Sequence, residues 1–287
     1  MKSMIKAMVR WGMRVRVRGV IGGWGGEGDG GLGMLARALR GALDDRLSGE
    51  EQRWVDQIER LRAELDGCAE EISMTDYGAG GSEEARTEAE MEQGKVVMRK
   101  VGDLSRCASK PYFWALVLFK LVREFGPTVC LELGTFLGIS GAYQGAALKL
   151  SGKGKLITLE GSESFAGRAE EHFGRLGLDN VNVVVGRFQD TLGAVLEREQ
   201  PIDFAFIDGH HDEKATLGYF DRIEPYLSRK AVVVFDDISW SAGMKRAWAA
   251  LEKHDRIRVS VNLREVGIGI VDDEIERKRS LDAPLIA

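Results

Sequence analysis

The chain has 287 residues, which is long for one small domain and short for two large ones, so we expect one core domain with an appendage. Hydrophobic residues make up 44% and charged residues 30%, as in an ordinary soluble globular protein, and a net charge of −5 gives no reason to expect a nucleic-acid partner. The three widely spaced cysteines, Cys68, Cys107 and Cys130, form neither a zinc pattern nor a disulfide framework, which favours a reducing, cytoplasmic environment.

The first 33 residues are basic and then rich in glycine. Basic residues interrupt the first 20 positions every few residues, so the continuous apolar core of a signal peptide is absent. No segment of the sequence approaches the roughly 20 apolar residues of a membrane span. We expect residues 1–33 to form a disordered leader. The alternative is a weak membrane-surface helix that presents Met4, Met8, Trp11 and Val15 on one face.

Residues 34–110 are predicted to form a helical N-terminal region. Ser48 and Glu51 have the spacing of a capping box at the start of a helix. An apolar stripe follows at helical spacing, and it should bury against the main domain or in a homodimer. The polar, glycine-containing stretch at 75–94 predicts a mobile loop that could close over a pocket as a lid. The stripe consists of Trp54, Ile58, Leu61 and Leu65.

A regular alternation of strands and helices occupies residues 111–272. A strongly apolar helix over 112–125 ends at Gly126 and Pro127. Apolar strands then alternate with helices, which predicts an α/β, Rossmann-like, doubly wound sheet of seven mostly parallel strands. The last two strands, 256–263 and 266–271, are too close for a helical crossover, so the last should be antiparallel. The charged tail, 273–287, is expected to be loosely ordered.

The turn after the first of these strands suggests a ligand site, because open parallel sheets bind ligands beyond the carboxyl ends of their strands. Phe136 and Ile139 stand where a dinucleotide fingerprint needs glycine, so a pyrophosphate is not expected. Glu132 could hold an ammonium group, and Gly134 lets the backbone pass close to a bulky ligand. Glu160 could accept ribose hydroxyls at the end of the next strand. Alternatively, the two acids merely end strands in solvent.

Four segments now carry a resemblance to a family: "LELGTFLGISG", "LITLEGS", "VNVVVGRFQDTL" and "IDFAFIDGHHDE". They resemble the successive motifs of class I S-adenosylmethionine-dependent methyltransferases, over roughly residues 100–272. The resemblance is closest to the small-molecule O-methyltransferase branch that includes the catechol and caffeoyl-CoA enzymes and their bacterial relatives. It implies a cofactor pocket formed by Glu132, Gly134, Thr135, Gly138, Ser140, Glu160, Gly161, Phe188 and Asp208.

The resemblance implies methyl transfer from S-adenosylmethionine to a small-molecule acceptor. A hydroxyl of a small molecule or natural-product intermediate is the expected acceptor. The alternatives are a carboxylate or amine of a peptide or metabolite, or a catalytically inactive protein that binds the cofactor.

The resemblance also implies roles for acids and histidines at two further strand ends. In metal-dependent relatives, an Asp at the fourth strand end and an Asp-Asn pair at the fifth hold Mg²⁺; here the corresponding residues are Asp208, Asp236 and Asp237. The relatives' lysine base is replaced by His211, so His211 or its neighbour His210 is expected to deprotonate the acceptor beside Asp208. Alternatively, these acids cap loops and helices while the histidines donate hydrogen bonds to backbone carbonyls.

Overall fold

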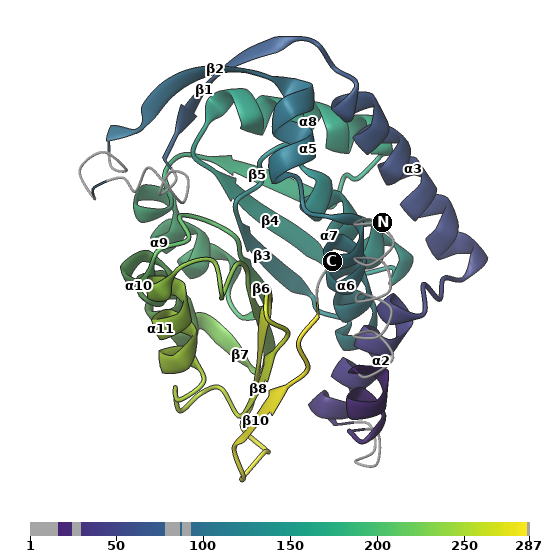
Figure 1. Cartoon of the computed structure of the whole chain (residues 1–287), viewed down its shortest axis with the longest axis vertical. Helices are drawn as coiled ribbons and strands as arrows, with labels where there is room; N and C mark the ends of the chain where they lie inside the picture. The colour runs from purple at the N-terminus through teal and green to yellow at the C-terminus, as the bar shows by residue number, and fades with distance from the viewer. Residues whose placement is uncertain (1–16, 25–29, 78–86, 88–92, 286–287) are drawn as a thin grey trace, which may run out of the picture.

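The predicted alternation of strands and helices folds as a doubly wound sheet in the computed structural model (Figure 1), which describes residues 17–24, 30–77, 87 and 93–285. The order of the eight strands is β10-β8-β9-β7-β6-β3-β4-β5. The strands are β3 (Val129–Leu133), β4 (Lys155–Glu160), β5 (Val181–Val185), β6 (Ile202–Ile207), β7 (Leu227–Phe235), β8 (Val259–Asn262), β9 (Gly267–Asp272) and β10 (Arg279–Asp282).

The strand directions confirm the prediction of a mostly parallel sheet. β3 pairs in parallel with β4 and β6, and β9 is antiparallel to both β7 and β8. Every residue of β3 is buried, because helices cover both faces of the sheet at its centre. The carboxyl ends of β3, β4 and β6 therefore meet at one edge, where a ligand can bind.

The C-terminal tail differs from the prediction, which gave seven strands and a loosely ordered segment over 273–287. Its residues 279–282 form an eighth strand, β10, parallel to β8. Ala283 and Leu285 are buried beyond it. The physical reason is that β8 would otherwise be an edge strand with unpaired backbone groups, and the tail pairs with them.

Helices cover the two faces of the sheet in separate layers (Figure 1). One apolar core includes α6, α7 and α8, and the other includes α9, α10 and α11. Most helix bounds match the predicted segments, and α6 ends at Gly126 in a left-handed conformation, as its sequence predicts. The bounds are α6 (Tyr112–Phe125), α7 (Ile139–Leu150), α8 (Glu163–Leu176), α9 (Phe188–Glu199), α10 (Glu213–Ile223), the 3₁₀ turn η1 (Glu224–Tyr226) and α11 (Ala242–Leu251).

Two N-terminal helices, α2 (Gly31–Leu43) and α3 (Gly49–Asp66), add an outer layer against α6 and α7. The predicted capping box begins α3: the Ser48 hydroxyl accepts from the Glu51 amide at 3.3 Å, and the Glu51 carboxylate accepts from the Ser48 amide at 2.9 Å. In the predicted stripe Trp54 is partly buried and Ile58, Leu61 and Leu65 are buried. This intramolecular packing accounts for the stripe without a homodimer.

The expected disordered leader is wrong for part of residues 1–33. Residues 17–22 are helical, and Val17, Ile21 and Trp24 are buried in the core. The apolar side chains pack because their spacing gives one helical face. The remainder of the leader, 1–16 and 25–29, lies outside the described residues, as does the alternative membrane-surface helix. None of the described helices is long and apolar enough to cross a membrane.

A separate hairpin of β1 (Glu71–Asp76) and β2 (Lys95–Lys100) precedes α5 (Val101–Ala108). In Figure 1 it runs along the end of the molecule where α8 and α5 lie. The Ser164 hydroxyl donates to the Ser73 carbonyl at 2.7 Å, which fixes β1 to α8. The first two residues of the predicted mobile loop, Thr75 and Asp76, belong to β1. Residues 78–86 and 88–92 of that loop lie outside the described residues.

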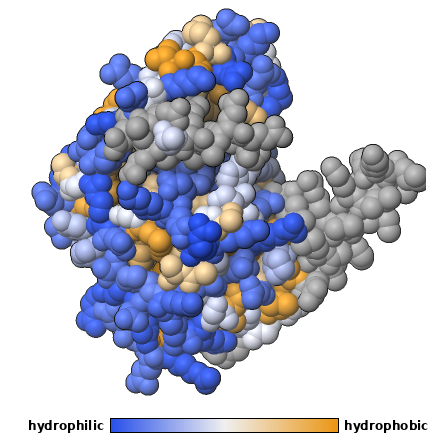
Figure 2. Space-filling model, turned by 60° about the vertical axis from the view of Figure 1, so that its left-hand side comes forward, coloured by the Kyte–Doolittle hydropathy of each residue, from blue (hydrophilic) through white to orange (hydrophobic). Residues whose placement is uncertain are grey.

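Hydrophilic residues predominate on the face that Figure 2 presents, where the described apolar residues gather in small separate patches. Such a surface is typical of a globular domain.

Candidate active site

The turn after β3 brings two strand ends into close contact. Gly134 has a φ of 106°, and a Cβ at this position would lie 2.1 Å from the carbonyl oxygen of Asp208. The Gly134 amide donates to the Leu159 carbonyl at 3.0 Å, and the Asp208 amide donates to the Leu133 carbonyl at 2.9 Å. Only glycine fits here, because any side chain would collide with the backbone of Asp208.

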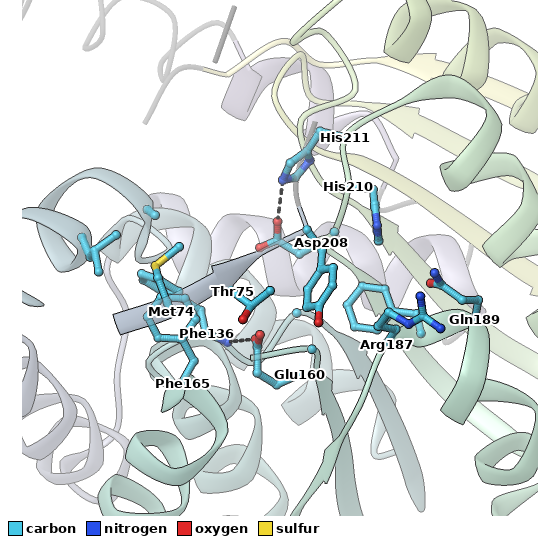
Figure 3. A pocket seen from close by; sticks show the side chains of 17 residues that line it. Met74, Thr75, Phe136, Glu160, Phe165, Arg187, Gln189, Asp208, His210 and His211 are labelled. Atoms are coloured by element: carbon cyan, nitrogen blue, oxygen red, sulfur yellow. Dashed lines mark hydrogen bonds and ion pairs between the residues drawn. The ribbon is translucent and has the colours of Figure 1, made fainter. Parts of the chain in front are cut away.

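A cavity of about 360 Å³ opens above these strand ends. Its size lies in the range of small-molecule sites. Figure 3 shows Met74, Phe136 and Phe165 on one side and Arg187 and Gln189 on the other. The cavity is lined by Met74, Thr75, Tyr77, Leu104, Ala108, Gly134, Phe136, Glu160, Gly161, Phe165, Arg187, Phe188, Gln189, Asp208, Gly209, His210 and His211. The predicted cofactor residues among them are Gly134, Glu160, Gly161, Phe188 and Asp208.

Glu160 is held rigidly at the carboxyl end of β4. One carboxylate oxygen accepts from the Phe136 amide at 2.8 Å (Figure 3). The other accepts from the Ser162 amide at 2.9 Å. Burial raises the pKa of Glu160, and these backbone hydrogen bonds oppose the rise. The carboxylate thus presents fixed acceptor oxygens to the cavity.

Gly161 follows Glu160 and lies under the hairpin. A Cβ at Gly161 would lie 2.9 Å from the ring of Tyr77, so the absence of a side chain lets that ring approach. The first turn beyond β1 therefore reaches the carboxyl end of β4.

Four predicted cofactor residues do not line the cavity: Glu132, Thr135, Gly138 and Ser140. Glu132 is fully buried, and it accepts from Gln144 Nε2 at 2.8 Å and from Thr158 Oγ1 at 2.6 Å. Burial raises its pKa to about 7, although hydrogen bonds from side chains lower it. The Glu132 carboxylate is thus turned into the core beneath the cavity, and its expected contact with an ammonium group stays a prediction.

His210 belongs to an aromatic cluster with Phe188 and Tyr219. Its Nδ1 shares a hydrogen bond of 2.8 Å with the Tyr219 hydroxyl, and its ring centroid lies 5.7 Å from that of Phe188. Gly209 makes room for this cluster, since a Cβ there would lie 2.5 Å from the Phe188 ring. His210 therefore fixes the wall of the cavity.

His211 lies between two carboxylates. Its Nε2 is 3.5 Å from Asp208 Oδ1, a contact drawn in Figure 3, and its Nδ1 is 3.7 Å from Asp237 Oδ2. The side chain is 31% exposed and lines the cavity, so a ligand can reach the imidazole. His210, His211 and Asp237 all have left-handed backbones, with φ of 62°, 48° and 51°. Such strain at three non-glycine residues of one edge is typical of functional sites.

Lys110 is a site residue that the sequence analysis did not identify. It lies between α5 and α6, and its Nζ is 2.9 Å from Asp208 Oδ2 while also contacting Asp236 Oδ2. The Lys110 and Asp236 side chains are only 9% and 6% exposed. Burial raises the pKa of Asp236 to about 6, and the charge of Asp208 adds to the rise. The surplus of acids at two adjacent strand ends was the one available signal that a cation must be nearby.

The predicted metal ligands are only partly brought together. Asp208, His211 and Asp236 each offer an atom, and these atoms lie within 4.8 Å of one another; Asp237 is outside this group. Two carboxylates and an imidazole are chemically suitable ligands for a divalent cation. However, the Lys110 ammonium group already contacts both carboxylates, so the residues present do not fit the expected ion.

The fold and the cavity agree with the resemblance that the sequence motifs carry. A doubly wound sheet with a reversed β9, a glycine turn and an acid at the next strand end is the class I methyltransferase arrangement predicted from the motifs. Residues 131–238 match the family model described as a methyltransferase domain. A sequence comparison with curated proteins gives no match.

Solved structures with a similar fold include O-methyltransferases. The Bacillus cereus O-methyltransferase, solved with SAH, is 24% identical, with a TM-score of 0.51 over 58% of this chain and 84% of that chain. TomG from Streptomyces achromogenes, an O-methyltransferase of tomaymycin synthesis solved with SAM, is also 24% identical, with a TM-score of 0.50 over 57% and 82%. SAH-bound PaMTH1 from Podospora anserina is 16% identical, with a TM-score of 0.52 over 76% and 96%. These similarities establish the shared fold.

Proposed function

We propose that this protein transfers a methyl group from S-adenosylmethionine to a hydroxyl of a small molecule. The observation that carries the proposal is the presence of Glu160, the Gly134 turn and His211 in one cavity. The methyltransferase match supplies the reaction class, and the bound SAM or SAH of similar structures suggests the donor.

Residues on the floor of the cavity are complementary to the groups of S-adenosylmethionine. Glu160 would accept hydrogen bonds from the ribose hydroxyls, because its carboxylate is already oriented by two backbone amides. Phe188 and Arg187 would flank the adenine ring. Gly134 would let the donor lie across the ends of β3 and β6.

The acceptor would enter from the side formed by the hairpin and α5. Met74 and Tyr77 come from β1 and the residue after it, and Leu104 and Ala108 come from α5. This mainly apolar side suits a small organic molecule, and its position over the strand ends suits a lid that excludes water.

His211 would remove the acceptor proton. When bound, the sulfonium donor would supply an electrophilic methyl carbon to the acceptor oxygen and would leave as a neutral thioether. His211 would take the hydroxyl proton of the acceptor on a ring nitrogen. The carboxylates of Asp208 and Asp237 stabilise the imidazolium that results. A carboxylate acceptor would already be ionised and would need no such base, which favours the hydroxyl.

Isothermal titration of the full-length protein with S-adenosylmethionine, SAH and NAD tests the proposal. We expect binding of the first two, and a loss of about tenfold to a hundredfold in affinity for Glu160→Gln, because a charged acceptor of ribose hydrogen bonds is removed. Glu163→Gln, at an exposed position on the first turn of α8, is the matched control and should bind normally. Tighter binding of NAD than of S-adenosylmethionine would overturn the donor assignment. Donor binding without turnover over a broad acceptor panel would favour the inactive alternative.

A further inference from the structure

Lys110 occupies the place between the two carboxylates where a divalent cation would lie. Its Nζ forms ion pairs with Asp208 and Asp236, which come from the ends of different strands, β6 and β7. The same Nζ lies 5.4 Å from the ring centroid of Phe206, in the position of a cation–π contact. Three separate groups on two strands thus hold one ammonium group.

Two carboxylates face the largely buried side chain of Lys110. Its Nζ lies 2.9 Å from Asp208 Oδ2 and also contacts Asp236 Oδ2, so both negative charges are paired with one ammonium group. The buried carboxylate of Asp236 and the partly buried carboxylate of Asp208 would repel each other without a cation between them. Lys110 therefore neutralises the charge of the two carboxylates, as a metal ion does in other acidic sites.

Lys110 is connected to the proposed base through Asp208. One oxygen of Asp208 contacts Lys110 at 2.9 Å, and the other lies 3.5 Å from His211 Nε2. Holding the first oxygen fixes the direction of the second. Since Lys110 does not line the cavity, it acts as a positioning residue and does not touch the reacting groups.

We propose that Lys110 is the built-in cation of this site, so that the protein works without a divalent metal. The role of Lys110 in catalysis rests on the proposed methyl transfer. Its effect on cation binding can be measured without turnover. Removal of the lysine side chain would open a cation site made of Asp208, Asp236 and His211, whose ligand atoms already lie within 4.8 Å of one another. The wild-type protein would have no such site.

The experiment compares Mn²⁺ binding by the full-length wild type, Lys110→Ala, Lys110→Met and Lys110→Arg, using calorimetry and the paramagnetic resonance of free Mn²⁺. Lys110→Ala should bind one Mn²⁺ at least about tenfold more tightly than the wild type. The two carboxylates lose the ammonium group that they share, and the removed side chain leaves space for the ion. Its melting temperature should rise when Mn²⁺ is added. Lys110→Met leaves the acids unpaired but fills the space, so it should be destabilised without comparable Mn²⁺ affinity. Lys110→Arg keeps the charge and should remain insensitive to Mn²⁺.

Two results would overturn the inference: stoichiometric Mn²⁺ binding by the wild type, or equal Mn²⁺ affinity in the wild type and Lys110→Ala. If Lys110→Ala does not fold, a wild type that is stabilised by Mn²⁺, or that loses activity in EDTA and regains it with Mg²⁺, overturns the inference as well. Activity that survives EDTA supports the built-in cation. Titration with S-adenosylmethionine is measured in parallel, so failure of donor binding in the wild type would refute the proposed function without changing the Mn²⁺ comparison.

Discussion

The buried carboxyl group of Glu132 should make the protein less stable as the pH rises. Its side chain is fully buried, and its pKa is raised from 4.5 to about 7, chiefly by burial. Below pH 4.5 the group is protonated in both folded and unfolded chains, so it imposes no penalty. Between these values the folded chain keeps a proton that the unfolded chain has released, and stability falls with pH. Above the folded pKa the full penalty is about 3 kcal/mol.

The Glu132→Gln variant should remove this dependence. Gln144 Oε1 is buried without a hydrogen-bond partner among the described residues, so the Gln144 amide can turn over and accept from the new amide at position 132. The free energy of unfolding, measured in urea at pH 5 and pH 8, should therefore fall by about 2.5 kcal/mol more in the wild type than in Glu132→Gln. Other titrating groups, including Asp236, are common to both proteins and cancel in this difference.

The control for this measurement is Glu50→Gln. Glu50 lies on the first turn of α3 with a side chain 73% exposed, so its substitution should leave the pH dependence of the wild type unchanged. Identical pH dependence in wild type and Glu132→Gln would refute the reasoning, since it would mean that Glu132 is ionised in the folded chain at no cost.

Two further predictions concern the cavity. With an acceptor found by screening, His211→Ala should lower kcat by about 10²–10⁴-fold, because the general base is lost, whereas His210→Phe should mainly weaken donor binding by disturbing Phe188; equal kcat for His211→Ala and wild type would exclude His211 as the base. Gly209→Ala should weaken S-adenosylmethionine binding by about fivefold or more, because its Cβ would lie 2.5 Å from the Phe188 ring and must displace it. Gly218→Ala, where nothing lies within 4 Å of the added carbon, is the matched control, and equal weakening in both variants would show that the contact with Phe188 is not the cause.

The local elements were predictable from the sequence because their signals are local. Ser48 and Glu51 mark the start of α3 by their spacing alone, and Gly126 marks the end of α6. The Gly134 turn was predictable as well, because its positive φ favours glycine, and the sequence shows the glycine directly. Five predicted cofactor residues line the cavity for the same reason: they follow strand ends.

The features that sequence analysis missed depend on pairing between distant segments. β10 exists because it pairs with β8, and its charged sequence alone favours a loose tail. Lys110 contacts an acid 126 positions further along the chain, and nothing in "ASKPYF" indicates that contact. Glu132 was expected in the cavity because it lies at a strand end. Side chains alternate between the two faces of a sheet, and the Glu132 carboxylate points toward Gln144 and Thr158. Which face it takes is decided by the packing of the helices on the sheet.

The position of Lys110 limits how this protein can be recombined with its relatives. The matched methyltransferase domain begins at residue 131, so Lys110 belongs to the segment that an engineer would exchange to alter acceptor choice. That segment also supplies Met74 and Tyr77 to the cavity. A chimera with a foreign N-terminal segment would therefore change both the charge beside Asp208 and Asp236 and the shape of the cavity. A workable graft must bring its own buried cation for Asp208 and Asp236 or replace one of those carboxylates by a neutral amide.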